Sequence, residues 1–490
     1  MADAAPPIDK IVGIHMSDTA PVRPGATPGD WPAPLFTGEP GARATVRIPG
    51  SKSLTNRYLL LAAMADSPSV VHAPLHSRDS LLMIKALEAL GARFESLETD
   101  SPFGPDLRVT PIDFSSAIPR YSTIDCGLAG TVMRFVPALA ALLPGEFGFD
   151  GDAHARKRPM APLLDGLRQL EVDVPCEGDQ ADALPFTVQS PGLAQHPVEG
   201  SAIPEVCIDA SASSQFVSAF LLVAPRLPQG LVIRHVGEAV PSVPHIEMTV
   251  ETLHELGVRV ESSPEQYTWV VRPGAIRGFE KTIEPDLSNA GPFLAAATVT
   301  GTSVTIPDWP APAGDGQPGT TQGGDMWREL LPAVGATVSY SEKGLTVTGS
   351  PAVGCEREYV FDLARCGELA PTLAAICALL PARTELRGIA HLRGHETDRL
   401  KALRVEIDRL GGSAHELDDG LVIDAPVQRA ATNAAVTVRT YEDHRMATFA
   451  AVLGLRVPGV VVENIATTAK TLPDFVGLWN NMLGQLEGSR

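Results

Sequence analysis

The strongest constraint on the fold is a pattern that occurs six times along the chain. Each time, an apolar stretch with helical periodicity ends at a Gly, Pro or Ser turn and passes into a run typical of a strand. Neighbouring runs are separated by 77, 85, 72, 82 and 75 residues, since they lie near Val70, Phe147, Val232, Val304, Leu386 and Val461. Units of about 80 residues are too long for a solenoid repeat. The even spacing therefore predicts six α/β units, three in each of two domains.

A second pattern is interleaved with the first. Helical stretches close near Gly91, Leu170, Gly257, Gly335 and Gly411, and a strand-like run follows each of them. Ordinary α/β alternation is the alternative explanation of both patterns. A chain of 490 residues with 44% hydrophobic content has enough apolar residues for two cores, because single domains rarely exceed ~250–300 residues.

Two segments depart from the repeated pattern. Residues 1–30 are rich in Pro, Ala and Asp and lack periodicity, so we expect a flexible extension there. Pro307–Gly324 (PDWPAPAGDGQPGTTQGG) is expected to be an inserted surface loop.

Composition and charge exclude several classes of protein. A formal net charge of −19 argues against a nucleic-acid partner, which usually needs a basic face. No apolar run approaches the ~18 residues of a membrane-spanning helix, and the first residues do not form a signal peptide. The six cysteines show no CxxC spacing, so we expect reduced thiols and a cytoplasmic protein. An acidic chain that gathers Lys and Arg in a few polar loops is expected to bind a small anion.

Gly50–Arg57 (GSKSLTNR) is the clearest of these loops. It lies between a strand-like segment at Thr45–Ile48 and a helix-like run at Tyr58–Met64. The free N–H groups and positive end of a helix that begins here would face an anion. Lys52 adds a mobile charge, and Arg57, expected near the end of the first helical turn, adds a planar fork.

Two further motifs place small or polar residues at a helix start. Ser122–Arg134 is a Gly-rich turn that opens a helix expected at Met133–Leu143, and Gly130 permits close approach to a ligand. A tight packing turn is its alternative. Asp209–Phe216 (DASASSQF) offers an uncharged anion site, with helix capping as its alternative. Its candidate residues are Ser213, Ser214 and Gln215.

Two other loops are strongly charged. Ala153–Pro159 (AHARKRP) carries three cations, and a proline at the first helical position would aim Arg158 rather than leave it in a solvated loop. His391–Arg399 (HLRGHETDR) holds two histidines four residues apart. Gly394 interrupts any helix between them, so an Arg–carboxylate pair with a general acid is favoured over a zinc site.

The remaining candidates come from three short motifs. Glu368 follows a strand-like run, with a helix-capping carboxylate as the alternative, and Arg445 and Lys470 lie in EDHRM and AKTLP, with surface ion pairs as the alternative. The combination is more informative than any single motif. Six cations and two carboxylates together occupy six polar loops, namely Lys52, Arg57, Arg158, Arg399, Arg445 and Lys470 with Glu368 and Glu396. Walker and dinucleotide-binding motifs are absent, so the sequence predicts acid–base group transfer between anionic substrates without nucleotide, metal or other cofactor.

Between Ala44 and Leu478 the motifs resemble those of the 3-phosphoshikimate 1-carboxyvinyltransferases, a family of enolpyruvyl transferases. They occur in the family order as PGSKSLTNR, LAGTVMR, RKRPM, SASSQF, HETDR, EDHRMA and TAKTLPD. The resemblance implies an inside-out α/β barrel fold of two domains, each built from three βαβαββ units. It also implies two crossings between domains, near Pro49–Lys52 and Ile283–Asp286. The domains would then span residues 31–50 plus 285–490, and residues 51–284.

The resemblance implies that phosphoenolpyruvate donates its enolpyruvyl group to the 5-hydroxyl of shikimate 3-phosphate, and that phosphate leaves. The residues implied to bind phosphoenolpyruvate are Lys52, Gly130, Arg158, Arg399, Arg445 and Lys470. Those implied to bind shikimate 3-phosphate are Lys52, Ser53, Arg57, Ser213, Ser214, Gln215, Ser242, Glu368 and His395. Glu368 would deprotonate the hydroxyl, and Glu396 would protonate the methylene carbon with help from Lys52 and Lys470. We expect the active form to be a monomer.

The chain departs from the family pattern at five positions. Leu128 and Phe135 replace a common asparagine and proline, so sensitivity to glyphosate, which inhibits many members, stays open. Glu368 stands where many members have aspartate, and His245 and His395 stand where tyrosine and lysine are common. The sister transferase acting on UDP-N-acetylglucosamine is the main alternative, but it commonly uses a cysteine in the loop corresponding to residues 151–159, which contains none here. A non-catalytic anion-binding protein, the third possibility, would need no carboxylates.

Overall fold

The structure is a computed structural model that describes residues 29–116, 118–176, 182–198, 203–238, 240–314, 319–350, 358–427 and 435–488. The extension expected at residues 1–30 therefore lies outside the described residues, apart from Gly29 and Asp30. Within the described ranges, no helix combines the length and apolar character needed to cross a membrane.

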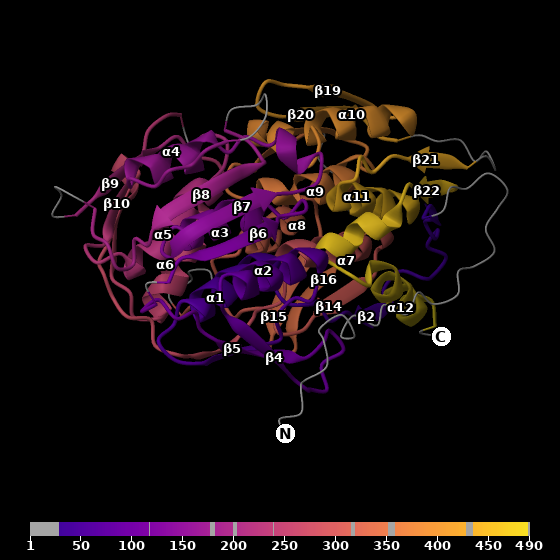
Figure 1. The fold of residues 1–490 in the computed structure, drawn as a ribbon. Helices are drawn as coiled ribbons and strands as arrows, with labels where there is room; N and C mark the ends of the chain where they lie inside the picture. Colours follow the sequence, from indigo (N-terminus) through magenta and orange to yellow (C-terminus); the bar gives the residue numbers. More distant parts are fainter. Residues whose placement is uncertain are drawn as a thin grey trace.

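Six small sheets repeat one topology around six central strands (Figure 1). Each central strand pairs in parallel with one neighbour and antiparallel with the other. The central strands are β3 (Ser69–His72), β7 (Pro144–Asp150), β10 (Leu231–His235), β14 (Ser303–Ile306), β18 (Arg383–Arg387) and β22 (Val460–Val462). They coincide with the six runs expected from the sequence, so the six-unit prediction is confirmed.

The other strands complete these sheets. The parallel neighbours, in sheet order, are β13 (Glu280–Thr282), β6 (Arg120–Asp125), β9 (Glu205–Ile208), β2 (Arg43–Thr45), β17 (Glu358–Asp362) and β21 (Val436–Val438). The antiparallel neighbours are β5 (Asp106–Thr110), β8 (Phe186–Pro191), β12 (Thr268–Val271), β16 (Gly344–Thr348), β20 (Leu421–Ala425) and β1 (Trp31–Pro32). Four sheets have a further strand, formed by β4 (Arg93–Leu97), β11 (Val260–Ser263), β15 (Thr337–Ser341) and β19 (Ser413–Glu416). The run after Leu170 was expected to be a strand as well, but it forms only isolated bridges at Asp173 and Cys176.

Each unit contains a largely buried helix that precedes its central strand. These helices are α1 (Lys52–Ala63), α3 (Gly130–Ala140), α5 (Gln215–Val223), α7 (Leu287–Thr300), α9 (Ala370–Cys377) and α11 (His444–Gly454). The outer helices are α2 (Arg78–Ala89), α4 (Ala161–Gln169), α6 (Pro244–Glu255), α8 (Trp327–Ala333), α10 (Arg399–Arg409) and α12 (Phe475–Gly488). Helices α1 and α3 begin three to six residues earlier than the apolar runs indicated, because their polar first turns belong to the helix.

The buried apolar residues form two separate cores. One core runs from Leu54 to Ile283. The other combines Ala44, Val46 and Ile48 with residues from Leu287 to Leu486. Figure 1 shows the indigo-to-magenta part of the chain beside the orange-to-yellow part. We propose that the two cores define two domains with the bounds expected from the sequence.

The chain passes from one core to the other twice, and the two passages are paired. We call Pro49–Lys52 the first crossover and Glu284–Leu287 the second crossover. Gly50 forms an antiparallel bridge with Pro285. The N–H of Ser51 donates to the carbonyl of Glu284 at 2.8 Å, and the N–H of Asp286 donates to the carbonyl of Pro49 at 2.9 Å. The two crossovers therefore form one joint between the cores.

Gly50 tests how tightly this joint is packed. A Cβ at this position would lie 2.3 Å from the carbonyl oxygen of Ala73 and 3.1 Å from the Ile283 side chain. Since overpacking of this kind typically costs about 1–3 kcal/mol, we expect Gly50→Ala to lower the free energy of unfolding by that amount in urea titrations. Gly274→Ala is the matched control, since no atom lies within 4 Å of its added Cβ. Equal stability of the two variants would contradict the prediction.

Candidate active site

One cavity is lined by both halves of the chain and by the starts of all six buried helices. Lys52, Gly130 and Gln215 open α1, α3 and α5, and each lines the cavity. The other three helices contribute residues at or just before their first turn, namely Asp286 and Ser288 for α7, Glu368 for α9, and His444 and Arg445 for α11. Free N–H groups and the positive ends of the helix dipoles therefore converge on one space. This arrangement favours an anionic ligand.

The structure brings nearly all of the predicted site residues together here. Those that line the cavity are Lys52, Ser53, Gly130, Arg158, Ser213, Ser214, Gln215, Ser242, Glu368, His395, Glu396, Arg399, Arg445 and Lys470. They come from segments up to 418 positions apart in the sequence, the separation of Lys52 from Lys470. Their convergence supports the interpretation of the separate motifs as one site.

Arg57 is the exception, because it lies one layer behind the cavity wall. Helix α1 begins at Lys52, so Arg57 is in its second turn rather than at the end of the first, and it is 1% exposed. Its guanidinium donates to the Thr249 hydroxyl at 2.8 Å, the Ser53 carbonyl at 3.0 Å and the His245 carbonyl at 2.8 Å. In this structure Arg57 therefore supports the backbone of two residues that line the cavity.

Arg158 reaches the cavity, although not for the reason expected. Pro159 is not the first residue of a helix, since α4 begins at Ala161 and Arg158 has an extended backbone. The Arg158 guanidinium donates to the Leu128 carbonyl at 3.4 Å, and its buried Nε has no partner. A Cβ at Gly130 would lie 3.2 Å from both terminal nitrogens of Arg158. The bare Gly130 thus leaves the guanidinium room beside the start of α3.

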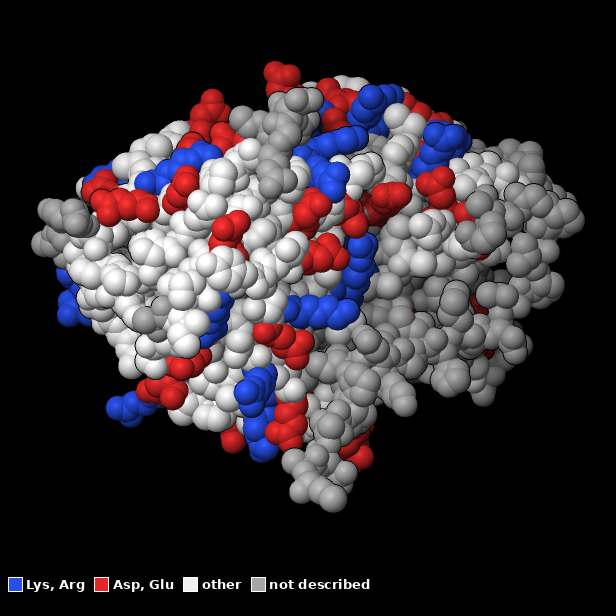
Figure 2. Space-filling model, in the orientation of Figure 1, with Lys and Arg blue, Asp and Glu red and all other residues white. Residues whose placement is uncertain are grey.

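The cavity has an excess of positive charge. Six Lys and Arg side chains line it against the three carboxylates of Asp286, Glu368 and Glu396. Lys52, Arg399 and Lys470 pair with acids. Among the described residues, the other three cations form no ion pair with a carboxylate; these are Arg134, Arg158 and Arg445. On the surface face in Figure 2, by contrast, Lys and Arg are interspersed with Asp and Glu. The unpaired cations inside an acidic chain indicate a ligand with more than one negative charge.

A buried charge network holds the paired cations. Arg399, 2% exposed, donates to Asp443 at 2.7 and 3.2 Å and to Glu396 at 2.8 Å. Lys470 donates to the other carboxylate oxygen of Glu396. Burial alone would raise the pKa of Glu396, but the charges of Lys470 and Arg399 hold it well below its ordinary value of 4.5. Glu396 is therefore ionised in this structure.

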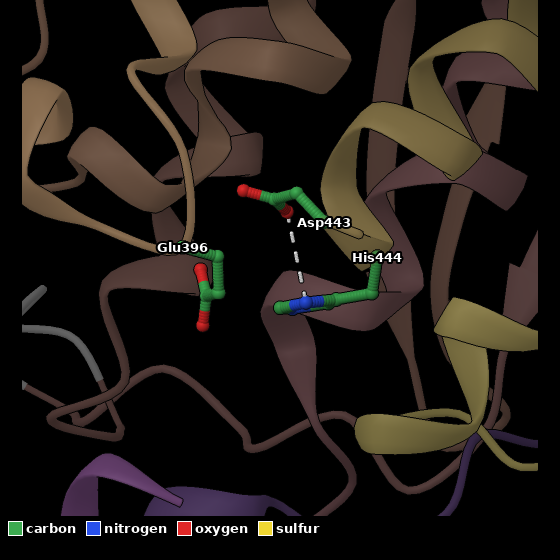
Figure 3. A group of neighbouring side chains, drawn as sticks. All are labelled: Glu396, Asp443 and His444. Carbon is green, nitrogen blue, oxygen red and sulfur yellow. Dashed lines mark ion pairs between the residues drawn. The ribbon is translucent and has the colours of Figure 1, made fainter. Parts of the chain in front are cut away.

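Glu396, Asp443 and His444 also form the one group of potential metal ligands within the described residues, with ligand atoms within 4.8 Å of one another (Figure 3). However, the carboxylates are already occupied by Arg399 and Lys470. The donor set fits a charge network better than a cation site, because several cations would repel an added metal ion.

Lys52 lines the same cavity as this network, from the start of α1. Its ammonium lies 3.4 Å from the carboxylate of Asp79, which is 2% exposed at the start of α2. Burial lowers the pKa of Lys52 from 10.5, and the nearby positive charges of Lys470 and Arg445 lower it further, although Asp79 opposes them. A lowered pKa makes the Lys52 ammonium a better proton donor than an ordinary lysine.

Sequence reasoning missed several residues in or near the cavity. Arg134 follows Gly130 by one helical turn, and its guanidinium donates to Ser213 at 2.8 Å and to Gln215 at 2.9 Å. That four-residue spacing was the available signal. Asp79 lies in the first turn of α2 and was not among the predicted site residues. Asp443 was also within reach as the cap of α11, and it accepts the N–H of Arg445 at 2.8 Å.

The depressed pKa of Glu396 predicts a pH-dependent contribution to stability. Above pH 4.5 the carboxylate is ionised in both states, so its ion pairs stabilise the fold fully. As the pH falls below 4.5, the unfolded chain takes up the proton first and this stabilisation is lost. We therefore expect wild type to lose stability relative to Glu396→Gln as the pH is lowered from about 5 towards about 3, measured by urea unfolding. Glu98→Gln, at an exposed position, should show no such trend. A difference between wild type and Glu396→Gln that stays constant with pH would refute the prediction.

Comparison with known proteins agrees with this geometry. Residues 38–479 match the family model described as EPSP synthase (3-phosphoshikimate 1-carboxyvinyltransferase). A 3-phosphoshikimate 1-carboxyvinyltransferase of Kocuria rhizophila is 54% identical over 455 residues, which are 93% of this chain and 96% of the relative. One of Bifidobacterium longum is 48% identical over 460 residues, which are 93% and 98% of the two chains.

Solved structures show the same fold. An EPSP synthase of Acinetobacter baumannii superposes with a TM-score of 0.70 at 20% identity and covers 91% of this chain and 97% of its own. A second structure of an EPSP synthase from that organism gives a TM-score of 0.68 with the same coverage. The family model spans most of the chain, and the relatives cover more than nine tenths of it. The chain therefore belongs to the EPSP synthase family.

Proposed function

We propose that this chain transfers the enolpyruvyl group of phosphoenolpyruvate to the 5-hydroxyl of shikimate 3-phosphate and releases phosphate. The observation that carries the proposal is the cavity itself, where six cations, three carboxylates and six helix starts converge. Two anionic substrates supply the negative charge that the unpaired arginines lack. The active unit proposed here is a monomer.

The placement of the side chains supports a division of the cavity between two ligands. Arg158, Arg399, Arg445, Lys52 and Lys470 are proposed to bind the carboxylate and phosphate of phosphoenolpyruvate, with Gly130 leaving room for them. Planar guanidinium groups suit both anions because they donate two parallel hydrogen bonds. The hydroxyl and amide groups on the other side are proposed to bind shikimate 3-phosphate, namely Ser53, Ser213, Ser214, Gln215 and Ser242, together with His395 and Lys52.

The two carboxylates have different proposed roles. Glu368 lies at the start of α9 without an ion pair among the described residues, and the Ser288 hydroxyl approaches it at 3.5 Å. We assign it to the 5-hydroxyl, whose proton it removes as the new C–O bond forms. Glu396 faces the cationic side and is assigned to the methylene carbon of phosphoenolpyruvate.

Glu396 must carry a proton before it can donate one. Its carboxylate is ionised as the structure stands, because Lys470 and Arg399 hold its pKa low. When the carboxylate and phosphate of phosphoenolpyruvate pair with these cations, their effect on Glu396 is offset and its pKa rises. Lys470, which already donates to Glu396, is then placed to pass it a proton.

Protonation of the methylene carbon and attack by the 5-hydroxyl give a tetrahedral intermediate. Loss of phosphate and of a proton from its methyl group then regenerates the enol ether. The ion pairs among Arg399, Glu396 and Lys470 hold the reacting groups in place between the two steps. Holding two substrates in register lowers the barrier by up to ~7–11 kcal/mol.

Phosphate release tests the proposed reaction directly. The protein should release phosphate from phosphoenolpyruvate when shikimate 3-phosphate is the acceptor, but not with UDP-N-acetylglucosamine, the acceptor of the sister transferase. The family match and the loop without cysteine favour the first acceptor. Release with the second acceptor alone would sink the proposal, and no release with either would favour a binding protein.

Lys52→Met tests the role of the lysine. The substitution keeps the length of the side chain but removes its charge and proton, so we expect turnover to fall at least ~100-fold. Circular dichroism should show an unchanged fold, since within the part of the chain that the structure describes the Lys52 ammonium has one hydrogen-bond partner, Asp79 at 3.4 Å. Lys85→Met, on the exposed face of α2, is the matched control and should retain full activity. Activity of Lys52→Met within tenfold of wild type would exclude the assigned role.

A further inference from the structure

The Pro/Gly-rich insertion at Pro307–Gly324 is more deeply anchored than the expected surface loop. Trp309 is 2% exposed, and its indole N–H donates to Asp325 at 2.6 Å. Arg328 donates to the carbonyl of Pro310 at 2.6 Å. These contacts hold the first residues of the insertion against Asp325 and Arg328, which follow its last residue. The function proposed above gives this insertion no role.

The returning end of the insertion grips the second crossover. The side chain of Gln322 is 6% exposed, and its amide N–H groups donate to the Glu284 carboxylate at 2.8 Å and to the Pro285 carbonyl at 3.0 Å. Its amide oxygen accepts the backbone N–H of Leu287 at 3.2 Å. The hydroxyl of Thr320 adds a bond to Glu284 at 2.7 Å. One side chain thus contacts three of the four residues of the second crossover.

These bonds lead directly to Lys52. The second crossover accepts the N–H of Ser51 at the Glu284 carbonyl, at 2.8 Å. The carboxylate of Asp286 accepts the N–H of Lys52 at 3.2 Å and that of Asn289, at the start of α7, at 3.0 Å. Two hydrogen bonds therefore link Gln322 to the backbone of Lys52: one from Gln322 to the second crossover, and one from the first crossover to the second.

Two glycines that follow Gln322, Gly323 and Gly324, bring the same segment against Glu368 and the start of α7. A Cβ at Gly323 would lie 2.8 Å from a carboxylate oxygen of Glu368. A Cβ at Gly324 would lie 2.5 Å from the backbone of Leu287 and Ser288. The absence of side chains here lets Glu368 and the start of α7 lie flush against the segment.

We propose that Gln322–Gly324 is a positioning element that holds Lys52 and Glu368 in their reactive geometry from opposite sides of the cleft. The inference rests on the proposed function. It assigns no contact between Gln322 and the reacting atoms; Gln322 acts through the crossovers, and Gly323 acts by leaving space. A displacement of about 1 Å in a reacting group can cost ~100-fold in rate.

Substitutions at Gln322 and Gly323 test this element. Gln322→Met keeps the volume of the side chain but removes its three hydrogen bonds, so kcat should fall 10- to 100-fold while both KM values change less. Gln229→Ala is the matched control, because Gln229 grips the backbone of Val198 through both amide atoms, at 3.1 and 3.2 Å, outside the cavity lining. It should retain kcat within twofold. Equal kcat values for the two variants would overturn the role of Gln322.

Gly323→Ala tests the space beside Glu368 and should lower kcat at least tenfold in the native chain. Glu368→Asp draws the carboxylate back by one methylene, so in that background Gly323→Ala should cost less than threefold. An equal loss in both backgrounds would show that Gly323 does not act through Glu368.

Hydrogen exchange gives a readout that needs no activity. Gln322→Met should speed exchange of the amides of residues 51–53 and 286–287 relative to wild type, whereas Gln229→Ala should not. Unchanged exchange there would overturn the inference even in an active enzyme. Failure of wild type to release phosphate would instead refute the proposed function, and the exchange comparison would still decide whether Gln322 holds the crossovers.

Discussion

The pairing of the two crossovers is the constraint on which the rest of the structure depends. Both passages between the cores run through one bridge, Gly50 with Pro285. The starts of α1 and α7 follow within two residues of it, so one set of backbone bonds orients two of the six helix ends that face the cavity. Lys52 is the first residue of α1 and inherits this placement. The backbone bonds that join the two cores therefore also position the reacting lysine.

The cavity is electrostatically incomplete without its ligands. Unpaired buried cations are costly, and helix dipoles that point inwards add to the positive potential. An exposed ion pair between the cores joins Arg365 and Glu247 at 2.9 Å, and the imidazole of His154 lies 3.5 Å from the carboxylate of Glu442. Such exposed pairs contribute at most about 1 kcal/mol each, so they are weak counterweights to this repulsion. Anionic substrates would offset this repulsion directly, and we propose that their binding favours closer approach of the two cores.

The sequence predicted the six units because each repeats one local pattern, and it predicted most of the site because charged motifs follow or open those units. It failed where tertiary packing decides. The placement of Arg57 behind the wall depends on an early start of α1, which an apolar run does not reveal. Likewise, the buried pairing of Asp443 with Arg399 joins residues 44 positions apart. Residues 311–314 of the insertion are exposed as expected, but the burial of Trp309 and Gln322 was not predicted, because it depends on contacts with residues outside the insertion.

His395 shows how a departure from the family pattern can be compatible with the site. Burial, followed by the charge of Arg399, holds its pKa well below 6.5, so the imidazole is neutral where a lysine would be charged. Its Nδ1 lies 3.4 Å from a terminal nitrogen of Arg399, which can only donate, so the imidazole accepts. A lysine there has no lone pair to offer and would repel the guanidinium. With histidine at this position the cavity has one positive charge fewer than it would have with lysine. The imidazole instead orients Arg399, whose other nitrogens donate to Asp443 and Glu396. With both sides of the guanidinium engaged, the direction in which Arg399 meets a ligand is set before the ligand arrives.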